Sequence, residues 1–295
     1  MINTEGENIM KVRNLILVTS ILFLLALPGC GEKKQEVVQP SGVINAKIVF
    51  DNGKVNADNV DGLSVSDKEV KITKPGSYVF SGTWNDGQIL VDVGKESEAV
   101  LVLDGVNITN TKSAPIYIKS AEKVKIELAD GKENVLTDAE FYEFADPQEN
   151  KPNACIYSKD DITIKGNGSL IVNANYNNGI GTSNDLKITG GNITVKAFNN
   201  GLKGNDSVTI SGGNIDITAE SDGIKVDNTE EAHKGFVNIT GGRIKIKAKD
   251  DAIDSTRSVT VNNADVKVSV GGQNVKCEGI VNIAEGCLSK IEAEE

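Results

Sequence analysis

The sequence predicts an all-β fold, a single-stranded parallel β-helix in which coils of about 22 residues form a solenoid. Three observations support this prediction. A motif of Asn or Asp, then Gly or Ala, then an aliphatic residue recurs at intervals of 22, 22 and 29 residues, beginning at Asn178, Asn200, Asp222 and Asp251. Apolar and polar residues alternate between these motifs. The chain also has 30 Gly, 6 Pro and only 4% aromatic residues, which favours strands and turns over helices.

Each coil is expected to contain two strands and a short third segment. In one coil, Val208 and Ile210, then Ile215, Ile217 and Ala219, point to one side, and the polar residues between them point to the other. The aliphatic residue of each motif supplies a third inward position. Consecutive coils would pair in parallel, with equivalent positions about 4.8 Å apart. The inward positions of the neighbouring coils are Leu186, Ile188, Ile193, Val195, Ala197, Val237, Ile239, Ile244, Ile246 and Ala248.

The same alternation extends towards the N-terminus with less regularity. Coils are predicted around 162–174, 116–126 and 101–108. Residues 43–90 alternate more weakly and are interpreted as the β cap that a solenoid needs at its end. Residues 281–291 are expected to close the other end. Two insertions, 131–153 and 227–235, interrupt the repeat, and insertions in solenoids form loops that often lie on the binding face.

The first thirty residues are interpreted as a lipoprotein signal peptide, with Met10 as the expected start. Lys11 and Arg13 precede an apolar run that is too short to span a bilayer. The sequence Leu27-Pro28-Gly29-Cys30 resembles a bacterial lipobox, which implies acylation of Cys30. Residues 31–42 would be a flexible tether and 43–295 the folded domain. The protein would then be extracellular and held at the membrane by lipid alone. The alternative is an ordinary secretory signal with a chance Cys.

The charge and the rare residues limit the partners of the chain. A net charge of -11 and a pI of about 4.8 argue against a nucleic-acid partner, and leave cation binding or a soluble extracellular surface. Zinc is not expected, because the chain has one His and no CxxC motif. Three further cysteines follow Cys30, namely Cys155, Cys277 and Cys287. Burial as small apolar residues is at least as plausible for them as a disulfide bond, for which Cys277 and Cys287 are close enough in sequence. We expect a monomer.

Stacking the motifs places polar residues in columns, which predicts a calcium site. One column contains Asn178, Asn200, Asp222 and Asp251; a second contains Asn184, Asn205 and Asp227. Carboxylates about 4.8 Å apart can share one Ca²⁺, whose oxygen ligands lie at about 2.3–2.6 Å. All-oxygen donors favour Ca²⁺ over transition metals. The alternative for the Asn residues is a purely structural amide ladder. The predicted ligands are Asp222, Asp227, Asp250, Asp251, Asp254, Asn200 and Asn205.

A further column and two aromatic residues are candidates for contact with a ligand. The column contains Gly181, Lys203, Lys225, Asp254 and Lys276, and Lys203 and Lys225 would pair with uronate carboxylates, with neighbouring Asp side chains, or with water alone. Tyr176 and Phe198 follow equivalent Ala residues and could form platforms for sugars. Structural stacking at a corner of the coil is the alternative for both rings.

Several segments together resemble a family of bacterial carbohydrate-binding domains found in clostridial and related surface lipoproteins. The resemblance spans about residues 45–290 and rests on motifs that are each weak alone. It implies a right-handed parallel β-helix, related in shape to pectate lyases, that holds calcium and binds polysaccharides such as cellulose and polygalacturonate without catalysis. The segments are Gly76-Ser77-Tyr78-Val79-Phe80-Ser81-Gly82, Leu103-Asp104-Gly105-Val106-Asn107-Ile108, Asn134-Val135-Leu136-Thr137-Asp138, Ala154-Cys155-Ile156-Tyr157-Ser158-Lys159-Asp160-Asp161 and the repeated motifs themselves.

Two other functions are compatible with the sequence. A calcium-dependent polysaccharide lyase would need a base, for which Lys203 or Lys225 is the candidate. The scarcity of Arg argues against it, because only Arg243 and Arg257 follow the leader and a guanidinium is expected to clamp the substrate carboxylate. The third reading is a structural surface spacer or adhesin.

Overall fold

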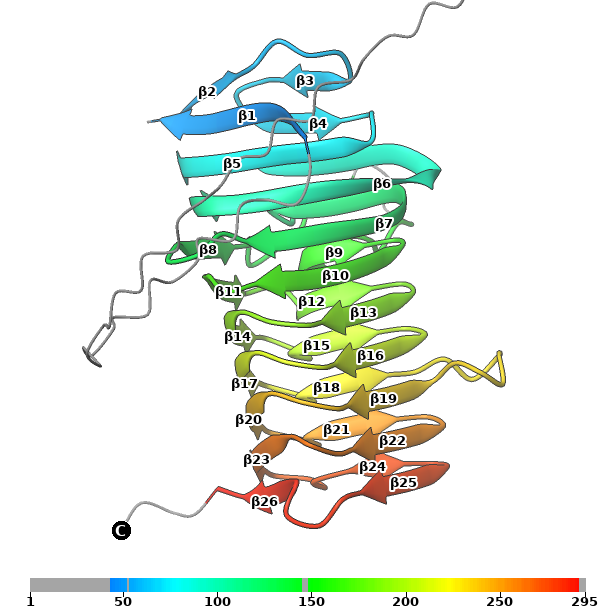
Figure 1. The fold of residues 1–295 in the computed structure, drawn as a ribbon. Coiled ribbons are helices and arrows are strands. Elements are labelled where there is room, and N and C mark those ends of the chain that lie inside the picture. Colours follow the sequence, from blue (N-terminus) through cyan, green and yellow to red (C-terminus); the bar gives the residue numbers. More distant parts are fainter. Residues whose placement is uncertain (1–42, 52, 145–147, 292–295) are drawn as a thin grey trace, which may run out of the picture. The chain divides into compact units, whose positions relative to one another are not determined.

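The computed structural model describes residues 43–51, 53–144 and 148–291, which form 26 strands and no helix (Figure 1). No helix that could cross a membrane is found in this part of the chain. The predicted signal peptide, the tether and Cys30 lie outside the described residues.

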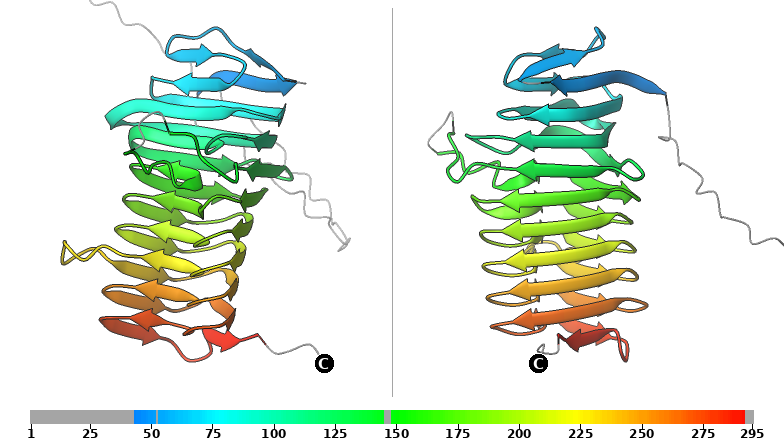
Figure 2. Two further views of the ribbon diagram at one scale, coloured as in Figure 1. Left: turned by 180° about the vertical axis from the view of Figure 1, so that it is seen from behind. Right: turned by 90° about the vertical axis from the view of Figure 1, so that its left-hand side faces the viewer.

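All strands except β2 and β3 form three parallel stacks that run the length of the described domain, as Figures 1 and 2 show. Each coil contributes one strand to each stack, and this parallel β-helix confirms the predicted fold class. The first stack contains β1 (Ile44–Asp51), β5 (Gly76–Trp84), part of β6 (Gln88–Thr109), part of β7 (Ile116–Leu128), β10 (Asp161–Gly166), β13 (Asp185–Ile188), β16 (Ser207–Ile210), β19 (Phe236–Ile239), β22 (Ser258–Val261) and β25 (Ile280–Ile283).

The second and third stacks complete the triangular coil. The second contains β4 (Glu69–Ile72), the first residues of β6 and β7, β9 (Ala154–Ser158), β12 (Asn178–Thr182), β15 (Leu202–Gly204), β18 (Ile224–Val226), β21 (Ile253–Ser255) and β24 (Lys276–Cys277). The third contains the end of β6, β8 (Glu133–Thr137), β11 (Ser169–Ala174), β14 (Asn192–Ala197), β17 (Asn214–Ala219), β20 (Arg243–Ala248), β23 (Asp265–Val270) and β26 (Leu288–Lys290).

The core lies between the stacks and follows the predicted register. Ile193 pairs with Ile215 and Ile215 with Ile244, and all three side chains are buried. The aliphatic residue of each motif is also buried, as Leu202 and Ile224 illustrate. The motif glycine is explained by close packing, since a Cβ on Gly201 would lie 2.3 Å from Ile217 and 2.7 Å from the carbonyl oxygen of Gly223. A parallel solenoid thus forms because each coil buries the same positions against the next.

Both ends and one insertion differ from the prediction. The antiparallel cap is smaller than 43–90, because only β1 with β2 (Lys54–Ala57) and β3 (Leu63–Val65) with β4 form hairpins, while β5 already pairs in parallel. Residues 281–291 form a last coil, but within the described residues no further strand covers its outer edge, and Ile280 is 64% exposed. Part of the predicted insertion 131–153 is a coil strand, β8. The insertion 227–235 lies between β18 and β19, as predicted.

Candidate functional site

A ladder of side chains links consecutive coils at the corner between the third and second stacks. We call it the Asx ladder; its members are Asn178, Asn200, Asp222 and Asp251. The Oδ1 atom of Asn178 accepts a hydrogen bond from Asn200 Nδ2 at 2.8 Å. The Oδ1 atom of Asp222 accepts the backbone N–H of Asp251 at 3.1 Å, and Asp251 accepts that of Gln273 at 2.7 Å. The first predicted column is therefore confirmed, and one oxygen of each Asp is committed to the fold.

The remaining carboxylate oxygens gather at the C-terminal half of this corner. Asp222, Asp251 and Asp254 are all buried, and each offers one oxygen atom that lies within 4.8 Å of the others. We call these three residues the carboxylate cluster. Its oxygen donors suit a hard cation such as Ca²⁺. It brings together three of the seven predicted ligands.

Two lysines partly neutralise the carboxylate cluster. Lys225 Nζ forms an ion pair with Asp254 and lies 3.4 Å from Asp222 Oδ2. Lys276 Nζ lies 3.1 Å from Asp254 Oδ2 and 3.4 Å from Asp251 Oδ2. Three carboxylates against two ammonium groups leave one negative charge. A divalent cation among these oxygens would have to displace at least one ammonium group, because like charges repel at such short range.

The pKa values in the cluster follow from burial and from these ion pairs. Desolvation raises the pKa of Asp222, although Lys225 and the N–H of Asp251 oppose it. Desolvation also acts on Asp254, but the bonds from Lys225 and Lys276 outweigh it and lower its pKa. Burial disfavours the charged form of Lys225, yet its bonds to Asp254 and Asp222 prevail and raise its pKa. Lys225 is thus held protonated in this arrangement.

The other predicted ligands have different partners. Asn200 is occupied in the Asx ladder, and Asn205 Nδ2 donates to Asp206 Oδ1 at 3.0 Å. Asp227 forms an ion pair with Lys203 at 2.6 Å, and the Asp250 side chain is exposed. The structure does not bring these four residues into the carboxylate cluster.

The second predicted column needs a correction. Asn228 Nδ2 donates to Asp206 Oδ1 at 2.8 Å, and both residues are buried. Asn184 lies 22 residues before Asp206, so it belongs to the same column as Asp206 and Asn228. Asn205 and Asp227 occupy the position that precedes this column. The sequence alignment of the coils missed this pair because it placed Asn184 one residue out of register.

The lysine column is confirmed and extends to two aromatic residues. Gly181 pairs with Lys203, Lys203 with Lys225, Lys225 with Asp254, and Asp254 with Lys276. In the preceding coils the equivalent positions are Tyr117 and Tyr157, whose ring centroids lie 5.9 Å apart. The Nζ atom of Lys151 lies 5.2 Å from the centre of the Tyr157 ring. Burial, aided by the charge of Lys203, lowers the pKa of Lys151.

An aromatic groove of about 730 Å³ lies on the outer face of β11, β14 and β17, beside the same corner. Phe141, Tyr176 and Phe198 line it, together with polar side chains that include Lys196 and Glu220. Phe141 is 79% and Phe198 65% exposed. Such large exposed rings in a concave surface suit a ligand with apolar faces and polar edges.

Tyr176 and Phe198 share this groove but are not stacked equivalents. One additional residue separates Ala174 from Asn178, compared with the separation of Ala197 from Asn200. The extra residue moves Tyr176 out of line with Phe198, and its ring stacks instead on Tyr142, with centroids 4.1 Å apart. Trp84, another aromatic of the chain, belongs to the core, where it is 1% exposed and stacks on Phe50.

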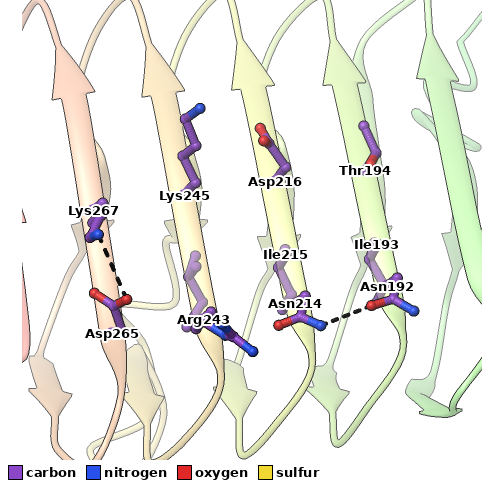
Figure 3. A pocket seen from close by; sticks show the side chains of 11 residues that line it. Asn192, Ile193, Thr194, Asn214, Ile215, Asp216, Arg243, Lys245, Asp265 and Lys267 are labelled. Atoms are coloured by element: carbon purple, nitrogen blue, oxygen red, sulfur yellow. Dashed lines mark hydrogen bonds and ion pairs between the residues drawn. The ribbon is translucent and has the colours of Figure 1, made fainter. Parts of the chain in front are cut away.

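A second groove, of about 380 Å³, lies on the same stack nearer the start of each strand (Figure 3). Two rows of side chains border it. Asn192 and Asn214 are joined by a hydrogen bond of 2.8 Å in one row, which continues to Arg243. Asp216 and Lys245 belong to the other row. The groove offers donors and acceptors, but no aromatic ring lines it.

Comparison with known proteins gives consistent matches. Residues 66–293 match the family described as carbohydrate-binding domain-containing protein. A protein of that description from Acetivibrio thermocellus is 83% identical over 287 residues, which cover 96% of this chain and all of the relative. A solved structure described as the polysaccharide lyase-like protein from C. thermocellum, a gadolinium derivative, is 87% identical. It covers 84% of this chain and 100% of its own, with a TM-score of 0.83.

Proposed function

Because the chain belongs to the family of carbohydrate-binding domain-containing proteins, we propose that it binds plant cell-wall or similar polysaccharides without catalysing their cleavage. The observation that carries this proposal is the aromatic groove, where the exposed rings of Phe141 and Phe198 lie beside polar side chains. Sugar rings have apolar faces that stack on aromatic rings, and hydroxyl edges that take hydrogen bonds. Neutral glycans such as cellulose are the ligands we assign to this groove.

Acidic glycans would be bound at the neighbouring lysine column and carboxylate cluster. Lys203 and Lys225 could pair with uronate carboxylates, and Ca²⁺ held by Asp222, Asp251 and Asp254 would bridge to the same groups. The related solved structure is a gadolinium derivative, and Gd³⁺, like Ca²⁺, is a hard cation that prefers oxygen ligands. Binding of polygalacturonate should therefore be stronger with Ca²⁺ than with EDTA.

Retention on insoluble polysaccharide tests the proposal. We expect the wild-type protein to be retained on cellulose, and replacement of Phe198 with Ala to reduce this retention severalfold. The matched control is Phe236→Ala, which removes a ring from the first stack, away from the groove. Equal retention of the wild type and the Phe198 variant would contradict the assignment of the groove. No retention on any polysaccharide would favour a structural spacer or adhesin.

A polysaccharide lyase is the second candidate, because the related solved structure is described as lyase-like. The ion pairs of Lys225 count against it, since they raise the pKa of a group that would have to lose its proton to act as the base. Incubation with polygalacturonate and Ca²⁺ should give no increase in the ultraviolet absorbance of unsaturated uronates. An increase in absorbance that disappears in Lys225→Ala or Lys203→Ala would show that the protein is a lyase and would contradict the proposal of binding without catalysis.

We propose in addition that the protein is an extracellular lipoprotein, anchored through Cys30. The support is the lipobox-like sequence that ends at this residue. In cells that express the full chain, the protein should fractionate with membranes, and Cys30→Ser should move it to the soluble fraction. A Cys30→Ser protein that still fractionates with membranes would argue against acylation as the anchor.

A further inference from the structure

The segment 138–144 forms one wall of the aromatic groove, although it belongs to an insertion rather than to a coil. It follows β8 directly and brings Phe141 to the groove beside Tyr176 and Phe198. The Phe141 ring is largely exposed and has no close aromatic partner among the described residues. Its place therefore depends on how the rest of the segment is held against the coil.

Asp138 holds the start of this segment. Its side chain is 3% exposed, and Oδ1 accepts the backbone N–H of Asn175 at 2.5 Å. Asn175 Nδ2 returns a hydrogen bond of 2.9 Å to the backbone oxygen of Asp138. The second carboxyl oxygen, Oδ2, lies 2.7 Å from the hydroxyl of Tyr142. These contacts join the segment to the coil residue that precedes Tyr176.

Tyr142 holds the end of the segment and completes the wall. Its ring stacks on that of Tyr176, with an interplanar angle of 18°, and Phe144 packs against both rings. Its hydroxyl lies 2.7 Å from Asp138 Oδ2 and 3.1 Å from the backbone oxygen of Ala154. Phe141 immediately precedes this anchored ring, so displacement of Tyr142 would displace Phe141 as well.

The hydrogen count at Tyr142 points to a proton on Asp138. The hydroxyl carries one hydrogen but faces two oxygen acceptors, Asp138 Oδ2 and the Ala154 carbonyl. With an ionised Asp138, the single hydroxyl hydrogen can serve only one of these two oxygens. With a protonated Asp138, the carboxyl donates to Tyr142, and Tyr142 donates to Ala154. Every group then has a partner, which is the arrangement that buried polar groups require.

We propose that Asp138 and Tyr142 form a proton-dependent latch, which closes when Asp138 is protonated and fixes Phe141 as a wall of the aromatic groove. Asp138 is a positioning residue in this account, because it acts on the glycan only through Phe141. The inference rests on the proposed function of the groove. The latch would make binding of neutral glycan stronger in mildly acidic than in neutral solution.

The surroundings of Asp138 support a switch in this pH range. Desolvation raises its pKa to about 6, against the opposing bonds from the Tyr142 hydroxyl and from the N–H groups of Asn175 and Tyr176. Among the described residues, the titratable side chains that interact with it are those of Tyr142 and Cys155. Burial raises the pKa of Tyr142 and of Cys155, so neither titrates near that of Asp138. A proton gained near pH 6 is therefore assigned to the Asp138 carboxyl group.

The test compares the wild type with Asp138→Asn between about pH 4.5 and 8, a range that brackets the pKa of a carboxyl raised by burial. The amide introduced by this substitution can donate to Tyr142 and accept from Asn175, so the variant mimics the protonated latch. Near-ultraviolet circular dichroism of the stacked tyrosines, without glycan, should titrate near pH 6 in the wild type and stay constant in Asp138→Asn. As the pH rises across this range, retention on cellulose should fall severalfold in the wild type but not in Asp138→Asn. Asp265→Asn, an exposed change on β23, is the matched control.

The possible results distinguish failure of the latch proposal from failure of the proposed function of the groove. A tyrosine signal that titrates identically in wild type and Asp138→Asn would overturn the latch. A wild-type signal that does not change over the same pH range would overturn it as well. If the tyrosine signal behaves as expected but no protein binds glycan, the latch stands and the proposed function of the groove is wrong. Tyr142→Phe keeps the ring but removes the hydroxyl, and it should abolish the pH dependence.

Discussion

Replacing Lys276 with Met should strengthen calcium binding at the carboxylate cluster. The ammonium group of Lys276 contacts Asp251 and Asp254 at 3.4 and 3.1 Å, where it competes directly with a cation for their oxygens. The substitution nearly keeps the length of the side chain and removes its charge. Two negative charges then remain in the cluster instead of one, which matches the charge of Ca²⁺.

The magnitude follows from Coulomb's law. A unit charge about 5 Å from a divalent ion opposes it by about 1.6 kcal/mol in water-like surroundings and several times more in protein-like surroundings. The Lys276 side chain is 50% exposed, so the lower end of this range applies. Each 1.4 kcal/mol is about a tenfold change in affinity. We therefore expect Ca²⁺ to bind Lys276→Met about ten times more tightly than the wild type.

The assay is isothermal titration with Ca²⁺ at low ionic strength, after treatment with EDTA and dialysis. Lys245→Met is the matched control, because Lys245 lies on β20 and forms no ion pair in the described structure. Without calcium, Lys276→Met should unfold at a slightly lower temperature than the wild type, because one ion-pair partner of Asp254 is lost. The reasoning is refuted if both lysine variants bind Ca²⁺ with wild-type affinity, or if calcium binds none of the proteins.

Three further predictions concern the core, the groove and the latch. Ile217→Ala should lower the free energy of unfolding by about 2–5 kcal/mol, measured by urea unfolding, because Ile217 is fully buried; a loss below about 1 kcal/mol would contradict its place in the core. Phe141→Ala should weaken cellulose retention while leaving the Ca²⁺ titration unchanged, and a change confined to calcium binding would contradict the separation of the two sites. Because the folded-state pKa of Asp138 is raised to about 6, the folded protein binds this proton more tightly than the unfolded chain. As the pH rises from about 4 to 6, the wild type should therefore lose about 2–3 kcal/mol in its free energy of unfolding, and Asp138→Asn should not. Parallel stability curves for the two proteins would contradict this.

The sequence predicts the solenoid well because its signal is repeated. An inward position such as Ile215 recurs in every coil, so the alternation around Ile193 and Ile244 reports the same slot several times. The ends lack such repetition. The sequence predicts a cap that reaches residue 90, yet β5 already pairs in parallel with β1 and β6. This coil is hard to recognise in the sequence because its strands pair with shifts of register, so its apolar residues are not evenly spaced.

The candidate site could be predicted only in part. The proximity of Asp222, Asp251 and Asp254 could be predicted, because the register of the stacked coils fixes their backbone positions. What a side chain does within its column depends on neighbours that spacing alone does not reveal. The Asp227 side chain forms an ion pair with Lys203 instead of joining the carboxylate cluster. The turn that contains Tyr176 has one extra residue, and the Tyr176 ring therefore stacks on Tyr142. The latch at Asp138 was not predicted, because its partners come from an insertion without a repeat.

The most direct test of the account is binding to polygalacturonate in the presence and absence of calcium. Affinity electrophoresis of the wild type through gels that contain the polymer should show retardation with Ca²⁺ and less retardation with EDTA. Asp254→Asn removes the carboxylate that both lysines share, so it should migrate alike under both conditions. Migration of the wild type that is unaffected by the polymer, with or without Ca²⁺, would contradict the proposal that this protein binds acidic polysaccharides through its carboxylate cluster.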